Sequence, residues 1–254
     1  MVCQVALPPD LEEAFFIRRL NRFAAEVTVR GSRELAHVPS SGRMAELLVP
    51  SRRVWVSRYR RGHCQAGLPK GGQAGTRKTA CRLLLAEHRG ILVSVDATLP
   101  NKLVARALRA GALAALAHYE TIRAEYSPGH SKGHSRFDFL LSAPPGHRPQ
   151  RCLLEVKSVT LVEAGVALFP DAPSSRGTKH LEELRAARAE EMAAAVLFVA
   201  QREDASCFTP HRRQDPAFAG ALERAAANGV QVLACRCRVT LDAVTLEEEI
   251  PVSF

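Results

Sequence analysis

Long apolar segments are missing from this sequence of 254 residues. No apolar run approaches the roughly 20 residues that a membrane-spanning helix needs, which argues against a helical membrane protein. The beginning of the chain also lacks the basic and then apolar order of a secretory signal, because Asp10, Glu12 and Glu13 stand there. We therefore expect a cytoplasmic protein without a membrane partner.

A metal-binding or disulfide pattern of cysteines is missing too. The seven cysteines are scattered, and no two of them are separated by the two-residue gap of a zinc knuckle. We expect reduced thiols that pack as small apolar side chains. With 46% hydrophobic and 24% charged residues, the composition is that of a globular protein and excludes collagen, coiled coil and disorder.

The excess positive charge is confined to the first part of the chain. Residues 1–95 contain 16 Lys and Arg against 7 Asp and Glu, a net of +9, whereas residues 96–254 contain 19 of each. This shift predicts a basic domain at 1–95 and a second domain at 96–254. A basic domain attracts polyanions, and nucleic acid in particular, because binding releases counterions. The alternative is an Arg-rich surface without a partner, but such a bias would extend into the second part.

The first domain is predicted to consist of short strands. Its segments alternate apolar and polar residues between turn signals, and helical periodicity is scarce. A small closed barrel of the oligonucleotide-binding (OB) type is the expected fold. Residues 62–75 hold five glycines and are predicted to form a basic loop. The candidate strands are 23–29, 53–57, 82–86 and 91–95.

Helices and strands alternate in the second domain, in the order α-β-β-β-α-β-α-β. This order predicts an α/β (α+β) fold, a mixed sheet with helices packed on it. Asp215 and Pro216 are typical of a helix start, and Gly229 of its end. The predicted helices are 103–116, 179–194 and 216–228, and the five predicted strands are 119–126, 136–142, 152–159, 195–200 and 230–235. Residues 244–250 are a candidate for one more strand at the end, a more exposed one.

Three charged residues, Asp138, Glu155 and Lys157, stand in strands that are otherwise apolar. A lone buried charge is costly, so each of them needs a partner. Glu155 and Lys157 are two residues apart, and their side chains therefore leave the same face of a strand. A hairpin through the proline-containing loop 142–150 would bring Asp138 beside Glu155.

Two carboxylates and a lysine in this arrangement are typical of a divalent-metal site. Carboxylates supply the hard oxygen ligands of Mg²⁺ or Mn²⁺, and the lysine could orient an attacking water or stabilise the transition state. An aspartate, a hairpin and then Glu-x-Lys is the core of the PD-(D/E)xK metal-dependent nucleases. A structural salt bridge among the three residues is the alternative on the pattern alone.

Five ordered motifs extend this pattern over nearly the whole chain. They are Ala-His-Val-Pro-Ser-Ser-Gly-Arg-Met at 36–44, Ser-Arg-Phe-Asp-Phe-Leu-Leu at 135–141, Leu-Glu-Val-Lys-Ser-Val-Thr-Leu at 154–161, Phe-Pro-Asp-Ala at 169–172 and Arg-Gly-Thr-Lys-His-Leu-Glu-Glu-Leu at 176–184. In order and spacing they resemble the sugar fermentation stimulation protein A (SfsA) family.

The resemblance implies an N-terminal OB fold and a C-terminal domain similar to PD-(D/E)xK nucleases. It also implies a DNA-binding protein linked to sugar, especially maltose, metabolism, and it supports the same three site residues. The family usually has a glutamate on a helix where Arg106 stands in this chain. Glu120 or Glu125 could supply the missing carboxylate, and Glu125 is preferred because the family commonly carries a glutamate there.

Two functions are compatible with these features. The first is a DNA-binding nuclease with Asp138, Glu155 and Lys157 as catalytic residues and with Asp138, Glu155 and Glu125 as ligands of Mg²⁺ or Mn²⁺. The second is a non-catalytic DNA-binding regulator of sugar metabolism that keeps the nuclease fold as a scaffold. RNA could replace DNA, and a homodimer is a candidate assembly. Gln201, at the end of a strand, is a candidate supporting residue. The residues expected to contact nucleic acid are Arg58, Arg60, Arg61, Arg77, Lys78, Arg176, Lys179 and His180.

Overall fold

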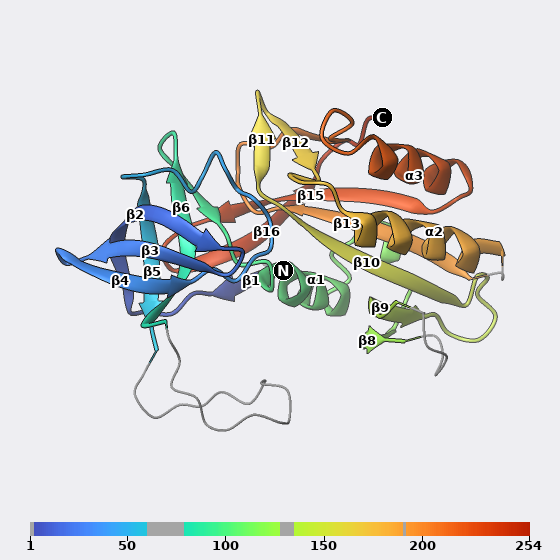
Figure 1. Ribbon diagram of the computed structural model, residues 1–254. Helices are drawn as coiled ribbons and strands as arrows, with labels where there is room; N and C mark the ends of the chain where they lie inside the picture. The colour runs from blue at the N-terminus through green and yellow to red at the C-terminus, as the bar shows by residue number, and fades with distance from the viewer. Residues whose placement is uncertain (1–2, 60–78, 128–134, 190–191) are drawn as a thin grey trace, which may run out of the picture. The chain divides into compact units, whose positions relative to one another are not determined.

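The computed structural model describes residues 3–59, 79–127, 135–189 and 192–254. The chain divides into two compact units (Figure 1). The first is Leu7–Ala97, and the second is Thr98–Phe254 together with strand β1 (Cys3–Ala6). The sequence predicted a division at residue 95 with the whole N-terminus in the first domain. Strand β1 belongs to the second unit instead, because it pairs with the last strand, β16 (Ala243–Glu249).

The first unit is a closed barrel. Its sheet has the strand order β4-β3-β2-β5-β6-β7, and it closes because β4 also pairs with β6. The five strands β2 to β6 form the OB-like barrel that the sequence predicted, and β7 extends it. The strands are β2 (Leu11–Asn21), β3 (Ala24–Val29), β4 (Ser32–His37), β5 (Arg53–Arg58), β6 (Cys81–His88) and β7 (Ile91–Ser94).

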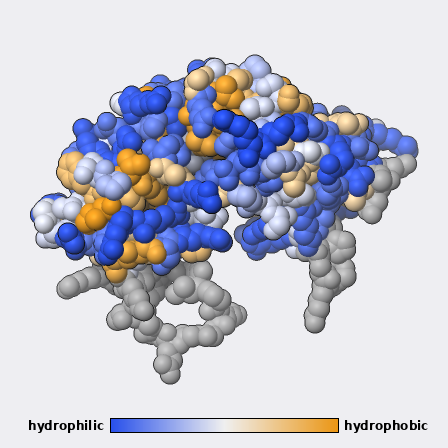
Figure 2. Space-filling view, turned by 45° about the horizontal axis from the view of Figure 1, so that its top comes forward, coloured by the Kyte–Doolittle hydropathy of each residue, from blue (hydrophilic) through white to orange (hydrophobic). Residues whose placement is uncertain are grey.

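Apolar side chains at alternate positions of the strands fill the interior of this barrel. Strand β3 buries Ala25, Val27 and Val29, which share one core with Val54 on β5 and Leu83 on β6. The face of the molecule shown in Figure 2 is mostly hydrophilic, with separate apolar patches. Among its described residues, the first unit exposes the large apolar side chains Phe15, Leu20 and Phe23.

The second unit is built on a mixed seven-stranded sheet of order β1-β16-β15-β13-β10-β9-β8. Its three central strands, β10, β13 and β15, run parallel, and the strands on both sides of them are antiparallel. A smaller sheet has the order β11-β12-β14. The strands are β8 (Thr121–Tyr126), β9 (Phe137–Ser142), β10 (Arg151–Val159), β11 (Leu161–Glu163), β12 (Val166–Phe169), β13 (Ala193–Ala200), β14 (Cys207–Pro210) and β15 (Gln231–Val239).

Helices cover this sheet. Figure 1 shows α2 and α3 on one side of the sheet and α1 on the other. Helices α2 and α3 pack on each other and on a core that includes Leu153, Phe198 and Phe208. The helices are α1 (Leu99–Arg109), α2 (Ser175–Ala189) and α3 (Pro216–Ala227), with a short 3-10 helix at Ala114–Leu116. Among the described residues, no helix is long and apolar enough to cross a membrane.

Capping residues, prolines and glycines set where the helices begin and end. Asp215 caps α3 as predicted, since its side chain accepts a hydrogen bond from the backbone N–H of Phe218. The prediction of a first helix over 103–116 was wrong at both ends. Helix α1 begins four residues earlier, with Pro100 in its first turn, and it ends at Arg109 because Gly111 takes a left-handed conformation with φ +63°.

Candidate active site

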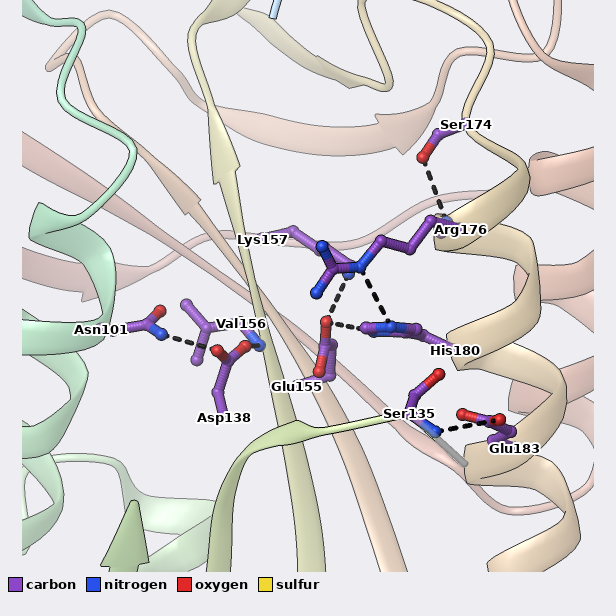
Figure 3. Close-up of polar contacts among 11 residues, drawn as sticks. Asn101, Ser135, Asp138, Glu155, Val156, Lys157, Ser174, Arg176, His180 and Glu183 are labelled. Carbon is purple, nitrogen blue, oxygen red and sulfur yellow. Dashed lines mark hydrogen bonds and ion pairs between the residues drawn. The ribbon is translucent and has the colours of Figure 1, made fainter. Parts of the chain in front are cut away.

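Glu155 is the most deeply buried acidic residue of the site, with 4% of its surface exposed in the middle of β10. Its Oε1 accepts hydrogen bonds from Lys157 Nζ at 2.6 Å and from His180 Nδ1 at 2.5 Å (Figure 3). Its Oε2 is buried and has no hydrogen-bond partner among the described residues. Oε1 thus accepts two hydrogen bonds from the protein, and the lone pairs of Oε2 accept none from the described residues.

These contacts keep Glu155 ionised. Burial by itself would raise the pKa of the carboxyl, but the hydrogen bond from His180 and the positive charge of Lys157 outweigh it, and the pKa is lowered. Lys157 is itself largely buried, since 13% of its side chain is exposed. The structure therefore brings this predicted pair together on one face of β10, as their two-residue spacing requires.

Asp138 lies where β9 and β10 separate. The antiparallel pairing of the two strands ends at Phe139 and Leu154. Beyond that point, Asp138 Oδ2 accepts the backbone N–H of Val156 at 2.8 Å, which replaces the missing ladder hydrogen bond. Burial and then the negative charge of Glu155 raise the pKa of Asp138. The charge of Glu155 thus disfavours ionisation of Asp138.

Asn101 is a site residue that the sequence did not reveal. It stands in the first turn of α1, and its Nδ2 donates a 2.6 Å hydrogen bond to Asp138 Oδ1. Figure 3 shows Asp138 on the α1 side of β10 and Glu155 on the α2 side. Arg106, at the position for which the family resemblance implied a glutamate, is exposed and donates to the carbonyl of Gln4. A polar residue next to a helix-start proline was the available signal for Asn101.

A basic pocket of about 460 Å³ adjoins Glu155 at the start of α2. Three of its side chains carry positive charge, and His180 connects it to Glu155. Lys179 Nζ lies 3.7 Å from Glu183, and Arg176 Nε donates to His180 Nε2 at 3.4 Å. The pocket is lined by Ser135, Arg136, Ser175, Arg176, Lys179 and His180.

Other predicted site residues lie apart from this centre. Glu125 is exposed and pairs with Arg136 at 3.5 Å, and the structure gives it no contact with Asp138 or Glu155. Glu120 is exposed as well. Gln201 is completely buried at the end of β13, and its Nε2 donates to Ser158 Oγ at 2.9 Å. In the part of the chain that the structure describes, no three His, Cys, Asp or Glu side chains are grouped closely enough to hold a metal ion.

Arg58 is the one predicted basic contact of the first unit that the described residues contain. Its guanidinium bonds to Glu12 at 2.8 Å and to both oxygens of Glu34, and these contacts raise its pKa further. Its charge is thus balanced within the barrel. The predicted contacts Arg60, Arg61, Arg77 and Lys78, and the predicted loop 62–75, lie outside the described residues.

The outer surface of the barrel carries an aromatic side chain between two arginines. Phe15 on β2 is 45% exposed. It stands opposite Arg53 on β5 and opposite Thr28 on β3, and Thr28 stands opposite Arg33 on β4. These four residues form a row across four strands, which we call the Phe15 row.

Two family models match the chain. One, described as "Sugar fermentation stimulation protein RE domain", matches residues 98–243. The other, described as "SfsA N-terminal OB domain", matches residues 17–95. The chain belongs to the SfsA family. The resemblance seen in the five sequence motifs is therefore confirmed.

Curated SfsA relatives are similar to the chain over nearly its full length. A sugar fermentation stimulation protein homolog of Desulforamulus reducens is 46% identical, covering 97% of this chain and 94% of the relative. A homolog of Symbiobacterium thermophilum is 45% identical, covering 94% and 93%. A solved structure, described as that of Pyrococcus furiosus SfsA in complex with Ca²⁺, covers 98% of both chains with a TM-score of 0.82 and 26% identity. The two-part fold is thus that of SfsA.

Proposed function

We propose that this SfsA protein binds DNA and hydrolyses its phosphodiester bonds with a divalent cation, Mg²⁺ or Mn²⁺, held by Asp138 and Glu155. The observation that carries the proposal is the buried Glu155 Oε2, which has no partner among the described residues although it belongs to an ionised carboxylate. Buried charges are normally fully paired or coordinated to a metal. A cation beside the two carboxylates would satisfy this oxygen.

The residues present fit a hard cation. Each oxygen of Asp138 accepts one hydrogen bond and retains a lone pair, and Glu155 Oε2 accepts none. Mg²⁺, Mn²⁺ and Ca²⁺ prefer oxygen ligands, namely carboxylates, backbone carbonyls and water. Two carboxylates are therefore enough protein side chains when carbonyls or waters complete the coordination of the cation. The Ca²⁺ named in the description of the Pyrococcus furiosus SfsA structure supports this class of cation.

Each residue of the centre has a distinct task in this proposal. A bound cation would supply positive charge against the charge that develops on the reacting phosphate. Lys157 uses one of its three N–H donors for Glu155 Oε1, and the other two, which bond to none of the described residues, could bond to a water or a phosphate oxygen. Asn101 and the Val156 N–H fix the orientation of Asp138.

Nucleic-acid binding is supported by charge. The basic pocket holds Arg136, Arg176 and Lys179 next to the start of α2, and both a helix N-terminus and basic side chains attract phosphate. In the first unit, the Phe15 row offers a ring on which a base could stack, with the exposed Arg33 in the same row for a phosphate. Arg53, on the other side of the ring, is paired with Glu13 and Glu87. Single-stranded DNA or RNA suits an exposed ring better than a paired duplex does.

A non-catalytic DNA-binding regulator of sugar metabolism is the second candidate. The ligand set favours it, because Glu125 is paired with Arg136 and Arg106 replaces the glutamate that the family usually has on the helix. In that case, the charged centre would serve binding or stability without turnover.

A cleavage assay separates the two candidates. Labelled single-stranded, duplex and branched DNA, with matched RNA strands, would be incubated with Mn²⁺ or with chelator. The variants are Asp138→Ala, Lys157→Ala and the exposed control Asp242→Ala. We expect Mn²⁺-dependent cutting that both site variants lose and the control keeps. A salt-sensitive shift without cutting, equal in all proteins, would contradict the nuclease and favour a non-catalytic DNA-binding protein.

A further inference from the structure

His180 is almost completely enclosed between Glu155 and Arg176. Only 2% of its side chain is exposed, although its helix α2 borders the basic pocket. Figure 3 shows the ring pointing from α2 toward β10, with Glu155 at one nitrogen and Arg176 at the other. The sequence suggested His180 as a nucleic-acid contact, but this burial points to a different task.

The two contacts fix which ring nitrogen carries the hydrogen. Arginine nitrogens can only donate, so Arg176 Nε makes His180 Nε2 the acceptor of their 3.4 Å hydrogen bond. In the neutral ring the hydrogen must then sit on Nδ1, which lies 2.5 Å from Glu155 Oε1. His180 is thereby a donor to Glu155, and Arg176 holds the ring in that orientation.

We propose that His180 is a positioning residue that holds Glu155 Oε1 and so keeps Oε2 available for the divalent cation. This inference rests on the proposed function, because it assigns a cation to Oε2. Lys157 also holds Oε1, but its four-carbon chain has more rotatable bonds than the planar ring of His180, which is buried and bonded to Arg176. In other metalloproteins, side chains that hydrogen-bond to a metal ligand orient that ligand in the same way.

The same chain of contacts gives Arg176 two tasks. Its Nε donates to His180, while its two Nη groups, which bond to none of the described residues, could bind a phosphate in the pocket that Arg176 lines. A phosphodiester oxygen bound there would be joined to Glu155 through one guanidinium and one imidazole. The substrate phosphate and the cation would then be held by a single connected set of side chains.

A purely structural role for His180 predicts something different. The ring also packs near Phe137, with 6.0 Å between the ring centroids, and could merely fill the space under α2. In that case, an apolar residue of similar size would leave cation binding intact. A variant that loosens the packing of α2 at another position would then change the affinity for the cation as much as a substitution of His180 does.

Calorimetric titration with Ca²⁺ tests the proposal on the full chain. His180→Leu removes the donor and His180→Asn restores one near the position of Nδ1, while Leu184→Ala loosens the fully buried packing of α2 without touching the site. We expect Ca²⁺ affinity to fall about 10- to 100-fold in His180→Leu. His180→Asn should recover most of it, and Leu184→Ala should retain wild-type affinity. Equal affinity in His180→Leu and wild type would overturn the positioning role and leave the proposed function standing.

Nitrogen NMR of cation-free protein gives a second, independent readout. We expect His180 to be the Nδ1–H tautomer, and we expect Glu155→Gln to shift that N–H resonance. An Nε2–H tautomer would overturn the inference. Wild-type protein that binds no Ca²⁺ at all would instead overturn the proposed function, and the positioning role with it.

Discussion

Removal of the Lys157 charge is expected to destabilise the protein strongly in the absence of cations. The Lys157→Met substitution keeps the length of the side chain but leaves Glu155, with 6% of its side chain exposed, with one fewer donor. Breaking a buried ion pair from one side costs about 3–5 kcal/mol, because the remaining charge stays buried. Since His180 still bonds to the same oxygen, we expect the lower end, a loss of about 3 kcal/mol in the free energy of unfolding.

Urea denaturation in the presence of a chelator measures this loss in the free energy of unfolding. Lys179→Met is the matched control, since that side chain is 53% exposed and lies 3.7 Å from Glu183. An exposed pair of this kind contributes about 0–1 kcal/mol. The double variant Lys157→Met/Glu155→Leu should regain much of the stability, because the buried charge of Glu155 is removed together with its partner. If Lys157→Met costs no more than Lys179→Met, the description of Glu155 and Lys157 as a buried, mutually dependent pair is wrong.

Further predictions concern both units. Asp215→Ala should lower the free energy of unfolding by about 0.5–2 kcal/mol in urea titrations, because α3 loses its cap. Phe15→Ala should weaken single-stranded DNA binding by about 1–3 kcal/mol in fluorescence titrations, while duplex binding changes little. Arg176→Gln should reduce the salt dependence of DNA affinity by about one phosphate contact. Burial raises the pKa of the Cys81 thiol to about 11 and that of Cys152 to about 12. Mass spectrometry after alkylation of folded protein at pH 8 should therefore find both thiols unmodified.

The fold was predictable where one face of a strand is buried. Strand β3 alternates cleanly and was predicted within a residue or two, and it led to the OB-like barrel. Strand β2 was missed because irregularities at Phe16/Arg18 and Arg19/Asn21 shift its alternation between the two faces. The short strands β11 and β12 carry too few residues for any period to show.

The site was predictable where neighbouring strands set the spacing. Asp138, Glu155 and Lys157 could be placed near one another because a hairpin and a two-residue step decide their positions. The contacts from Asn101 and His180 could not be foreseen, since they come from two helices packed on opposite sides of the sheet. Glu125 was predicted as a metal ligand, but its side chain is exposed. Its backbone is left-handed, with φ +54°, and the strand pattern gave no sign of this local change.

A crystal of the protein grown with Mn²⁺ tests the central claim most directly, because anomalous scattering locates that ion without assumptions. We expect one strong peak within coordination distance of Glu155 Oε2 and of Asp138, and we expect Asp138→Ala to lose it. An ordered site without a peak at saturating Mn²⁺, or a peak bound only by other side chains, would contradict the assignment of the cation to this pair.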